Sequence, residues 1–103
     1  MIKYNVYVGL NDKDTLNQII DTTKAKKEIY NILLKNNIKG YTIYLVNGVF
    51  TNEKNEITRE KTLKLELLDI KKDDIIKAIQ EIKKTLNQES ILLEEEKKEV
   101  SFL

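Results

Sequence analysis

The sequence predicts an α+β fold in which two helices cover one face of a four-stranded antiparallel sheet. Three observations predict it: alternating apolar residues at the start of the chain, two stretches with helical apolar spacing, and a long pair of strand-like segments between those stretches. With 103 residues, the chain is long enough to build one modest core. We therefore expect a single domain over residues 1–103.

The first strand and the first helix are predicted from their apolar spacing. The apolar positions of the strand alternate with polar ones and are Ile2, Tyr4, Val6, Val8 and Leu10. After a loop at residues 11–15, Asp21, Thr22 or Thr23 provides the N-cap of a helix that runs to about Asn36. The apolar face of this helix comprises Ala25, Ile29, Ile32 and Leu33.

A central hairpin organises the rest of the chain. Residues 41–50 are almost continuously apolar, which indicates a strand that is covered on both faces. Asn47-Gly48 interrupts this strand, either as a two-residue turn or as a glycine bulge in one long bent strand. We favour the bulge because the turn would leave a very short partner strand. The better turn lies at residues 52–55, and residues 57–68 form the second strand. The buried positions of that strand are Leu63, Leu65 and Leu67.

The second half of the chain predicts another helix and a last strand. Asp73 and Asp74 begin the helix, where carboxylates suit the positive end of the helix dipole. Its apolar stripe comprises Ile75, Ala78, Ile79, Ile82 and Leu86. Residues 90–95 form the last strand, and the alternation of Val100 and Phe102 suggests an extra C-terminal strand or arm. The order of elements, βαββαβ, is that of a ferredoxin-like fold.

Several chemistries are excluded by composition. The chain has no histidine and no cysteine, so catalytic triads, thiol catalysis and imidazole-bound zinc are impossible. Asp12 and Asp14 form a D-x-D pair, but Leu16 and Asn17 break the calcium-loop pattern, so we interpret the pair as loop caps. The standard glycine-rich phosphate-binding loops are absent. We expect no metal, no cofactor and no catalytic residue, and hence a protein that is not an enzyme.

Composition also limits location and partners. No apolar run approaches the roughly 20 residues that span a bilayer, and no signal peptide precedes the first strand. Without cysteine the chain suits a reducing compartment, so we expect a cytoplasmic protein with no membrane partner. A net charge of +1 predicts no general attraction to nucleic acid. The abundance of lysine, asparagine and isoleucine suggests an AT-rich genome, such as that of a low-GC bacterium or of one of its phages or plasmids.

The central strand predicts self-association. Both of its alternating faces are too apolar for either to face water, yet the two helices of this fold cover only one side of the sheet. Burial against further copies of the chain is the simplest remedy. The residues that we expect in such an interface are Tyr41, Ile43, Tyr44 and Val46.

Arg59 is the best single candidate for a ligand contact. It is the one arginine among seventeen lysines, and a guanidinium binds phosphate or carboxylate with two parallel hydrogen bonds. The commoner role for such a residue is a surface cross-strand pair with a glutamate, and this alternative stays open. Around Arg59 the candidate ligand-binding residues are Lys61, Lys64, Gly48 and Phe50.

The element order, the interruption at Gly48, the long hairpin and the helix after Leu67-Leu68-Asp69 are similar to those of the PII-like signalling proteins. A closer resemblance is to a small uncharacterised bacterial family of this type. The residues that carry it are Gly9-Leu10, Gly48-Val49-Phe50, Arg59-Glu60 and Gln88-Glu89-Ser90-Ile91-Leu92. The PII-like resemblance implies a homotrimer that binds nucleotides or other small anions in clefts between subunits, beside the hairpin loop. The hairpin tip lacks the PII-type glycine cluster and tyrosine motif, so ATP in particular is not implied.

Three functional hypotheses follow. The first is a homo-oligomer, with a trimer favoured, that holds a small anionic ligand such as a nucleotide signal between its subunits, as a sensor or a sequestering protein. The second is an interaction module of phage or plasmid type that inhibits a host protein. The third is an enzyme of the dimeric ferredoxin-like barrel type, which the absence of histidine disfavours.

Overall fold

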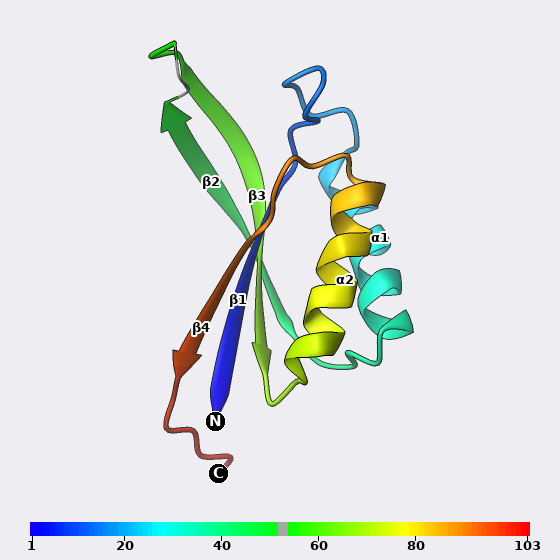
Figure 1. Cartoon of the computed structure of the whole chain (residues 1–103), viewed down its shortest axis with the longest axis vertical. Coiled ribbons are helices and arrows are strands. Elements are labelled where there is room, and N and C mark those ends of the chain that lie inside the picture. The colour runs from blue at the N-terminus through cyan, green and yellow to red at the C-terminus, as the bar shows by residue number, and fades with distance from the viewer. Residues whose placement is uncertain (52–53) are drawn as a thin grey trace.

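A computed structural model describes residues 1–51 and 54–103, with the side chain of Phe50 outside the described part. The elements follow in the predicted order: β1 (Ile2–Gly9), α1 (Thr22–Lys35), β2 (Thr42–Thr51), β3 (Ile57–Leu68), α2 (Lys72–Thr85) and β4 (Leu92–Lys97). Both helices lie on one side of the sheet, and the two termini lie close together at one end of the molecule (Figure 1). The ferredoxin-like α+β fold is therefore confirmed.

The four strands form one sheet in the order β2-β3-β1-β4, and every neighbouring pair is antiparallel. The registers place Val6 opposite both Leu65 of β3 and Leu93 of β4. Because side chains alternate along a strand, these residues share the face that the helices cover. The opposite face of the sheet, which we call the open face, carries the other set of side chains.

The core lies between the sheet and the helices. The predicted apolar faces are buried: those of β1, β3 and both helices contribute Val6, Val8, Leu63, Leu65, Leu67, Ala25, Ile29, Leu33, Ile75, Ala78 and Ile82, each at most 2% exposed. Each valine, leucine or isoleucine among them contributes roughly 1.5–3 kcal/mol by leaving water. This core fixes β1, β3 and the ends of both helices, and so positions the loops that follow them.

The helices begin and end as the sequence indicates. Asp21 is the N-cap of α1, and its carboxylate accepts a hydrogen bond from the backbone N–H of Lys24 at 2.8 Å. Asn37 and Asn87 follow α1 and α2 in the left-handed conformation, with φ of 64° and 48°. Asparagine tolerates this conformation better than most residues, which allows the chain to leave each helix sharply.

Two details of the strands differ from the predictions. Gly48 forms neither a turn nor a bulge: β2 and β3 stay in one register from Thr42↔Glu66 to Thr51↔Ile57. The glycine instead makes room, because a Cβ there would lie 3.1 Å from Thr62 Oγ1. The extra C-terminal strand is also absent: β4 ends at Lys97, and Lys98 still exchanges backbone hydrogen bonds with Met1, the first residue of the chain. Within the described ranges, no helix is long and apolar enough to cross a membrane.

Candidate functional site

Three segments that are far apart in sequence gather at the end of the molecule opposite the termini (Figure 1). They are the β1–α1 loop, the outer part of the β2–β3 hairpin and the α2–β4 loop. A hollow of about 640 Å³ lies among them. We call it the acidic hollow. The residues that line it are Asn11, Asp12, Lys13, Leu16, Lys54, Glu56, Thr58, Glu60, Gln88, Glu89 and Ser90.

The two loops of the acidic hollow are joined through Asp12. Its Oδ2 accepts hydrogen bonds from the backbone N–H groups of Asp14 and Thr15 at 3.0 and 2.9 Å, and its Oδ1 accepts one from Asn87 Nδ2 at 2.7 Å. The backbone of Asn87 in turn accepts a hydrogen bond from Lys13 N–H at 3.0 Å. The hydrogen bond from Asn87, followed by that from Thr15, lowers the pKa of the Asp12 carboxyl. Asp12 therefore caps its loop, as the sequence indicates.

Gln88 fixes the same wall from the other side. It is 7% exposed, and its Nε2 donates to the carbonyl of Asn11 at 2.8 Å. The hydrogen bond spans 77 positions of sequence and holds Asn11, the second residue after β1, against the α2–β4 loop. This wall of the acidic hollow is therefore formed by two loops whose backbones are held together by hydrogen bonds.

Glu60 lies where the hairpin meets this wall. Its Oε2 accepts a hydrogen bond from Asn11 N–H at 3.0 Å, and its carboxylate lies directly over Gly9. A Cβ at Gly9 would come within 2.4 Å of Glu60 Oε1, so only glycine leaves the carboxylate in place. Asn11 Nδ2 also donates to the carbonyl of Arg59 at 3.2 Å. Glu60 is thus a carboxylate in a defined position.

A second, shallower hollow of about 450 Å³ adjoins the first and shares Asn11 and Glu60 with it. We call it the basic hollow because Arg59 and Lys61 line it. Its remaining walls are Gln18, Asn47, Gly48 and Val49. Arg59, Lys61 and Gly48, three of the five residues predicted to bind a ligand, therefore lie together.

Arg59 is exposed and lies opposite Val49 in the ladder, so its direct cross-strand neighbour is not a glutamate. It forms no ion pair with another residue of the described part. The guanidinium is thus available to a ligand in the basic hollow.

The other two predicted ligand contacts are not brought to this hollow. Lys64 is an odd number of residues from Lys61, so it points to the opposite side of β3 and lies on the open face between Tyr7 and Tyr44. The side chain of Phe50 lies outside the described residues.

The two hollows differ in charge. Four carboxylates and two lysines line the acidic hollow, whereas two cations and the shared Glu60 line the basic hollow. Asn11 and Glu60 line both hollows, although Glu60 alternates along β3 with Arg59 and Lys61, and we call the two hollows together the cleft. Such a cleft suits a ligand with hydrogen-bond donors at one end and an anionic group at the other. In the described part of the chain, no group of three or more metal-ligating side chains is present.

The residues predicted to form an interface are divided between two faces. Tyr41 and Ile43 are half-buried and pack against the core of their own chain. Burial, followed by the nearby Tyr30, raises the pKa of Tyr41. Tyr44 and Val46 lie on the open face, beside Lys64 and Thr62. Of the four predicted interface residues, Tyr44 and Val46 therefore face away from the helices.

Glu60, Asn11 and Gln88 were not predicted as site residues. Their roles depend on contacts between segments some 50 to 80 positions apart, which spacing does not reveal. One signal was present: Gly9, Gly48, Arg59-Glu60 and Gln88-Glu89-Ser90, which carry the resemblance to a bacterial family, all line the cleft or contact its carboxylate.

The sequence places the chain in a family. Residues 3–102 match the model described as "Protein of unknown function (DUF3574)", so the chain belongs to that family. No curated protein matches it in sequence.

Solved structures share the fold. A phage SAM lyase in complex with S-methyl-5'-thioadenosine is 20% identical over 92% of this chain and 79% of its own, with a TM-score of 0.70. CutA1, a divalent ion tolerance protein from Ehrlichia chaffeensis, is 16% identical over 97% and 84%, with a TM-score of 0.60. The B. subtilis GlnK–ATP complex is 17% identical over 91% and 81%, with a TM-score of 0.54. GlnK bears out the resemblance to the PII-like proteins in fold.

The prediction that the protein is not an enzyme is wrong as it was argued. The phage lyase is an enzyme with this fold, and it was solved both with S-methyl-5'-thioadenosine and in the apo state. The prediction relied on the absence of histidine and cysteine, but carboxylate, tyrosine and lysine side chains also serve in acid–base catalysis. This chain has all three kinds, and Glu60 lies in the cleft.

Proposed function

We propose that this member of the DUF3574 family is a homo-oligomer, with three copies favoured, that binds a small nucleotide-type ligand in the cleft formed by its acidic and basic hollows. The observation that carries the proposal is the convergence of three distant segments around Glu60, where a cavity with a fixed carboxylate meets a hollow with two cations. The volume of the acidic hollow, about 640 Å³, is typical of small-molecule sites.

The charges of the cleft suggest how such a ligand lies. Arg59 offers a planar fork of donors that matches a phosphate or carboxylate, and Lys61 adds a second positive charge. Glu60 and Glu89 in the acidic hollow accept hydrogen bonds, a role that carboxylates play toward ribose hydroxyls in dinucleotide sites. A nucleotide combines ribose hydroxyls, which donate hydrogen bonds, with an anionic phosphate, and the arrangement offers acceptors for the former and cations for the latter.

The structural comparisons support an adenosine-containing ligand. The phage lyase was solved with S-methyl-5'-thioadenosine and GlnK with ATP, both on the same fold. We therefore place adenine nucleotides and adenosine thioethers or sulfonium compounds first among the ligands to test.

The cleft of a single chain is too open to hold such a ligand alone. Arg59 and Lys61 are exposed, whereas small-molecule sites cover most of the surface of their ligand. A neighbouring copy is the proposed source of the missing wall, which makes the oligomer part of the binding site.

A thermal-shift screen tests the ligand class. The probes are AMP, ADP, ATP, S-adenosylmethionine and S-methyl-5'-thioadenosine, with adenine and inorganic phosphate as partial ligands. A ligand that binds the folded state raises the melting temperature, and we expect a shift of several degrees at saturating concentration. If none of the intact nucleotides or nucleosides changes the melting temperature, the ligand class is wrong.

The phage lyase favours a second candidate function, conversion of the bound ligand. The test is to incubate each ligand that shifts melting with the protein and to identify products by mass spectrometry, with the Glu60→Gln variant alongside. Product formation by wild type that Glu60→Gln abolishes assigns catalysis to the cleft, and unchanged ligand after long incubation leaves binding as the function. The hypothesis of docking on a host protein stays a prediction.

A further inference from the structure

Leu16 has the one hydrocarbon side chain among the described residues that line the acidic hollow. The other side chains of the lining carry charges, amides or hydroxyl groups. Leu16 belongs to the β1–α1 loop, which lies at the same end of the molecule as the hairpin tip (Figure 1), and its side chain is 67% exposed. An exposed leucine in the wall of a cavity offers an apolar surface to the ligand that the cavity holds.

The backbone of Leu16 is in the left-handed conformation, with φ of 61°. This conformation is unfavourable for most residues, because the Cβ atom comes too close to the following carbonyl oxygen. Glycine, asparagine and aspartate adopt it at lower cost. The other non-glycine residues of the described chain with a positive φ are Asn37, Asn55, Asp69 and Asn87. Leucine is therefore the exception at a position where this chain otherwise uses asparagine or aspartate.

Hydrogen bonds hold the loop in this shape. Leu16 N–H donates to the carbonyl of Asp12 at 2.8 Å, and Asp12 N–H donates to the carbonyl of Asn17 at 2.8 Å. Asp12 is also joined to Asn87, which fixes the segment to the α2–β4 loop. The closure of this loop does not require leucine, since asparagine or glycine at position 16 would allow it with less strain. The leucine side chain therefore calls for a role in the acidic hollow.

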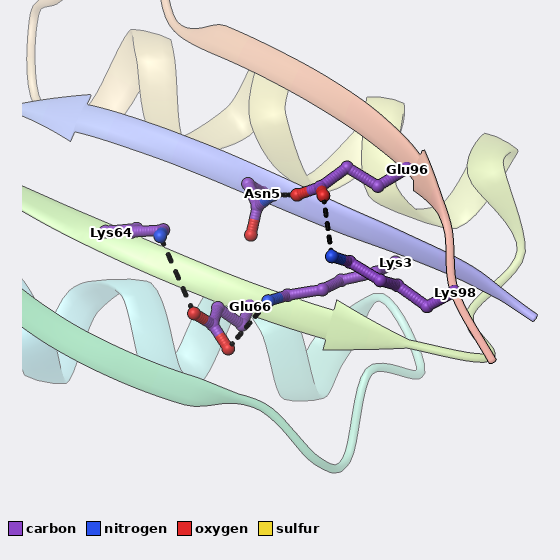
Figure 2. A network of polar contacts seen from close by, with 6 residues as sticks. All are labelled: Lys3, Asn5, Lys64, Glu66, Glu96 and Lys98. Carbon is purple, nitrogen blue, oxygen red and sulfur yellow. Dashed lines mark hydrogen bonds and ion pairs between the residues drawn. The ribbon is translucent and has the colours of Figure 1, made fainter. Parts of the chain in front are cut away.

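The tyrosine rings of the open face are the other surface on which the base of a nucleotide could lie. Lys64 Nζ already lies 5.6 and 5.9 Å from the ring centroids of Tyr7 and Tyr44. Figure 2 shows that the same lysine pairs with Glu66, at 3.6 Å, and that Glu66 pairs with Lys3, at 3.3 Å. These five residues satisfy one another and line neither hollow, so Leu16 is the better contact for a base.

We propose that Leu16 packs against the base of the bound ligand, so that the acidic hollow holds the adenosine part. This inference rests on the proposed function and adds the contact that recognises the base. A nucleobase has two flat faces of low polarity, and packing one of them on Leu16 removes both surfaces from water. The hydrogen-bonded loop holds the leucine side chain in place before the ligand arrives.

Leu16→Asn tests this contact, because asparagine suits the backbone and removes the apolar surface. We expect the ligand-free variant to melt a few degrees above the wild type, since the strain is relieved. Its affinity should fall by about five- to thirtyfold, because the apolar contact with the base is lost. Isothermal titration measures the affinity for ATP and for S-methyl-5'-thioadenosine, which share adenosine and differ in charge. A structural role for Leu16 would not combine higher stability with weaker binding.

Two further variants serve as a control and a second test. Ile19 of the same loop is 68% exposed and lines neither hollow, so Ile19→Asn should bind both probes as the wild type does. Leu16→Ala keeps the strained backbone and loses most of the apolar surface. It should therefore bind both probes more weakly than the wild type without a rise in melting temperature.

The outcomes separate this inference from the proposed function. Equal affinities of the wild type, Leu16→Asn and Leu16→Ala overturn the inference and leave the proposed function in place. A change in the number of copies in sedimentation of Leu16→Asn also overturns it, because Leu16 then faces a neighbouring copy. A wild type that binds neither probe overturns it too, and the full thermal-shift screen then decides the proposed function separately. Weaker binding by both Leu16 variants, with Ile19→Asn unchanged, supports the inference.

Discussion

Gly9 controls the position of Glu60, and this contact is the most specific feature of the cleft. We expect Gly9→Ala to push the carboxylate away from Asn11, because the new methyl group would overlap it. Ligand affinity should fall while the fold survives, since the displaced group is the end of a flexible side chain. Isothermal titration with the best ligand of the thermal-shift screen measures the change.

Gly40→Ala is the matched control, because no atom lies within 4 Å of a Cβ built at Gly40. Its affinity should equal that of the wild type. Equal affinities for Gly9→Ala and Gly40→Ala would show that the position of Glu60 does not matter for binding.

Arg59 should supply the strongest single contact to an anionic group. One hydrogen bond to a charged group contributes about 1.5–3 kcal/mol, so Arg59→Ala should weaken binding by about ten- to a hundredfold or somewhat more. Arg59→Lys should restore part of this loss, because lysine keeps the charge but not the fork. Lys26→Ala, at an exposed position of α1, is the control for net charge. A ligand that binds Arg59→Ala as tightly as the wild type would exclude the basic hollow.

At this scale the sequence could identify Arg59 and Lys61 but not their surroundings. Chemical type alone singled out the one arginine, and alternation along β3 put Lys61 on the same side. The same alternation places Lys64 on the open face. The prediction grouped Lys64 with Lys61 because the two are close in sequence, without applying this alternation. Asn11 and Glu60 meet only because β1 and β3 pair, so their contact follows from the register of the sheet.

The β1–α1 loop and the α2–β4 loop behave as one element because Asp12 and Asn87 join them. The pKa of Asp12 is lowered from 3.8 in the folded chain, so this carboxylate stabilises the fold above its unfolded-state pKa. Its contribution should be lost as the pH falls below 3.8 and through the folded pKa. The hydrogen bond with Lys35 lowers the pKa of Glu81, and the hydrogen bond with Lys98 lowers that of Glu96. The contributions of these two carboxylates to stability are therefore also lost as the pH falls.

Asp12→Asn tests the role of this carboxylate. The variant should be less stable than the wild type at pH 7, and the difference should shrink as the pH falls below 3.8, because the wild type loses the charge that the variant lacks. Chemical denaturation at a series of pH values gives both curves. A stability difference that stays constant down to pH 2 would mean that the charge of Asp12 does not contribute.

The elements themselves could be predicted well from periodicity, and the exceptions have physical causes. Leucine alternation identified β3, and helical spacing identified α1 and α2. The prediction for Gly48 was wrong because a glycine within a strand has two common causes, a bulge or a close approach of another group, and the sequence does not distinguish them. Here the close approach is that of Thr62 Oγ1, which would lie 3.1 Å from a Cβ at this position.

The whole molecule is a two-layer fold with one covered face and one open face. Its topology could be predicted because the order of elements leaves few alternatives. The predicted interface residues of β2 do not share one face of the sheet, because the prediction used the apolar content of β2 and did not apply its alternation. Tyr41 and Ile43 pack against the core, whereas Tyr44 and Val46 lie on the open face.

The central claim is that copies of this chain together bind a nucleotide-type ligand in the cleft around Glu60. Native mass spectrometry at micromolar concentration, with the best ligand of the thermal-shift screen added, tests it most directly. The account predicts a homo-oligomer that retains one ligand for each chain, and the same oligomer without ligand for Arg59→Ala. A monomer of 12.1 kDa, or an oligomer whose ligand survives both Arg59→Ala and Glu60→Gln, would contradict it.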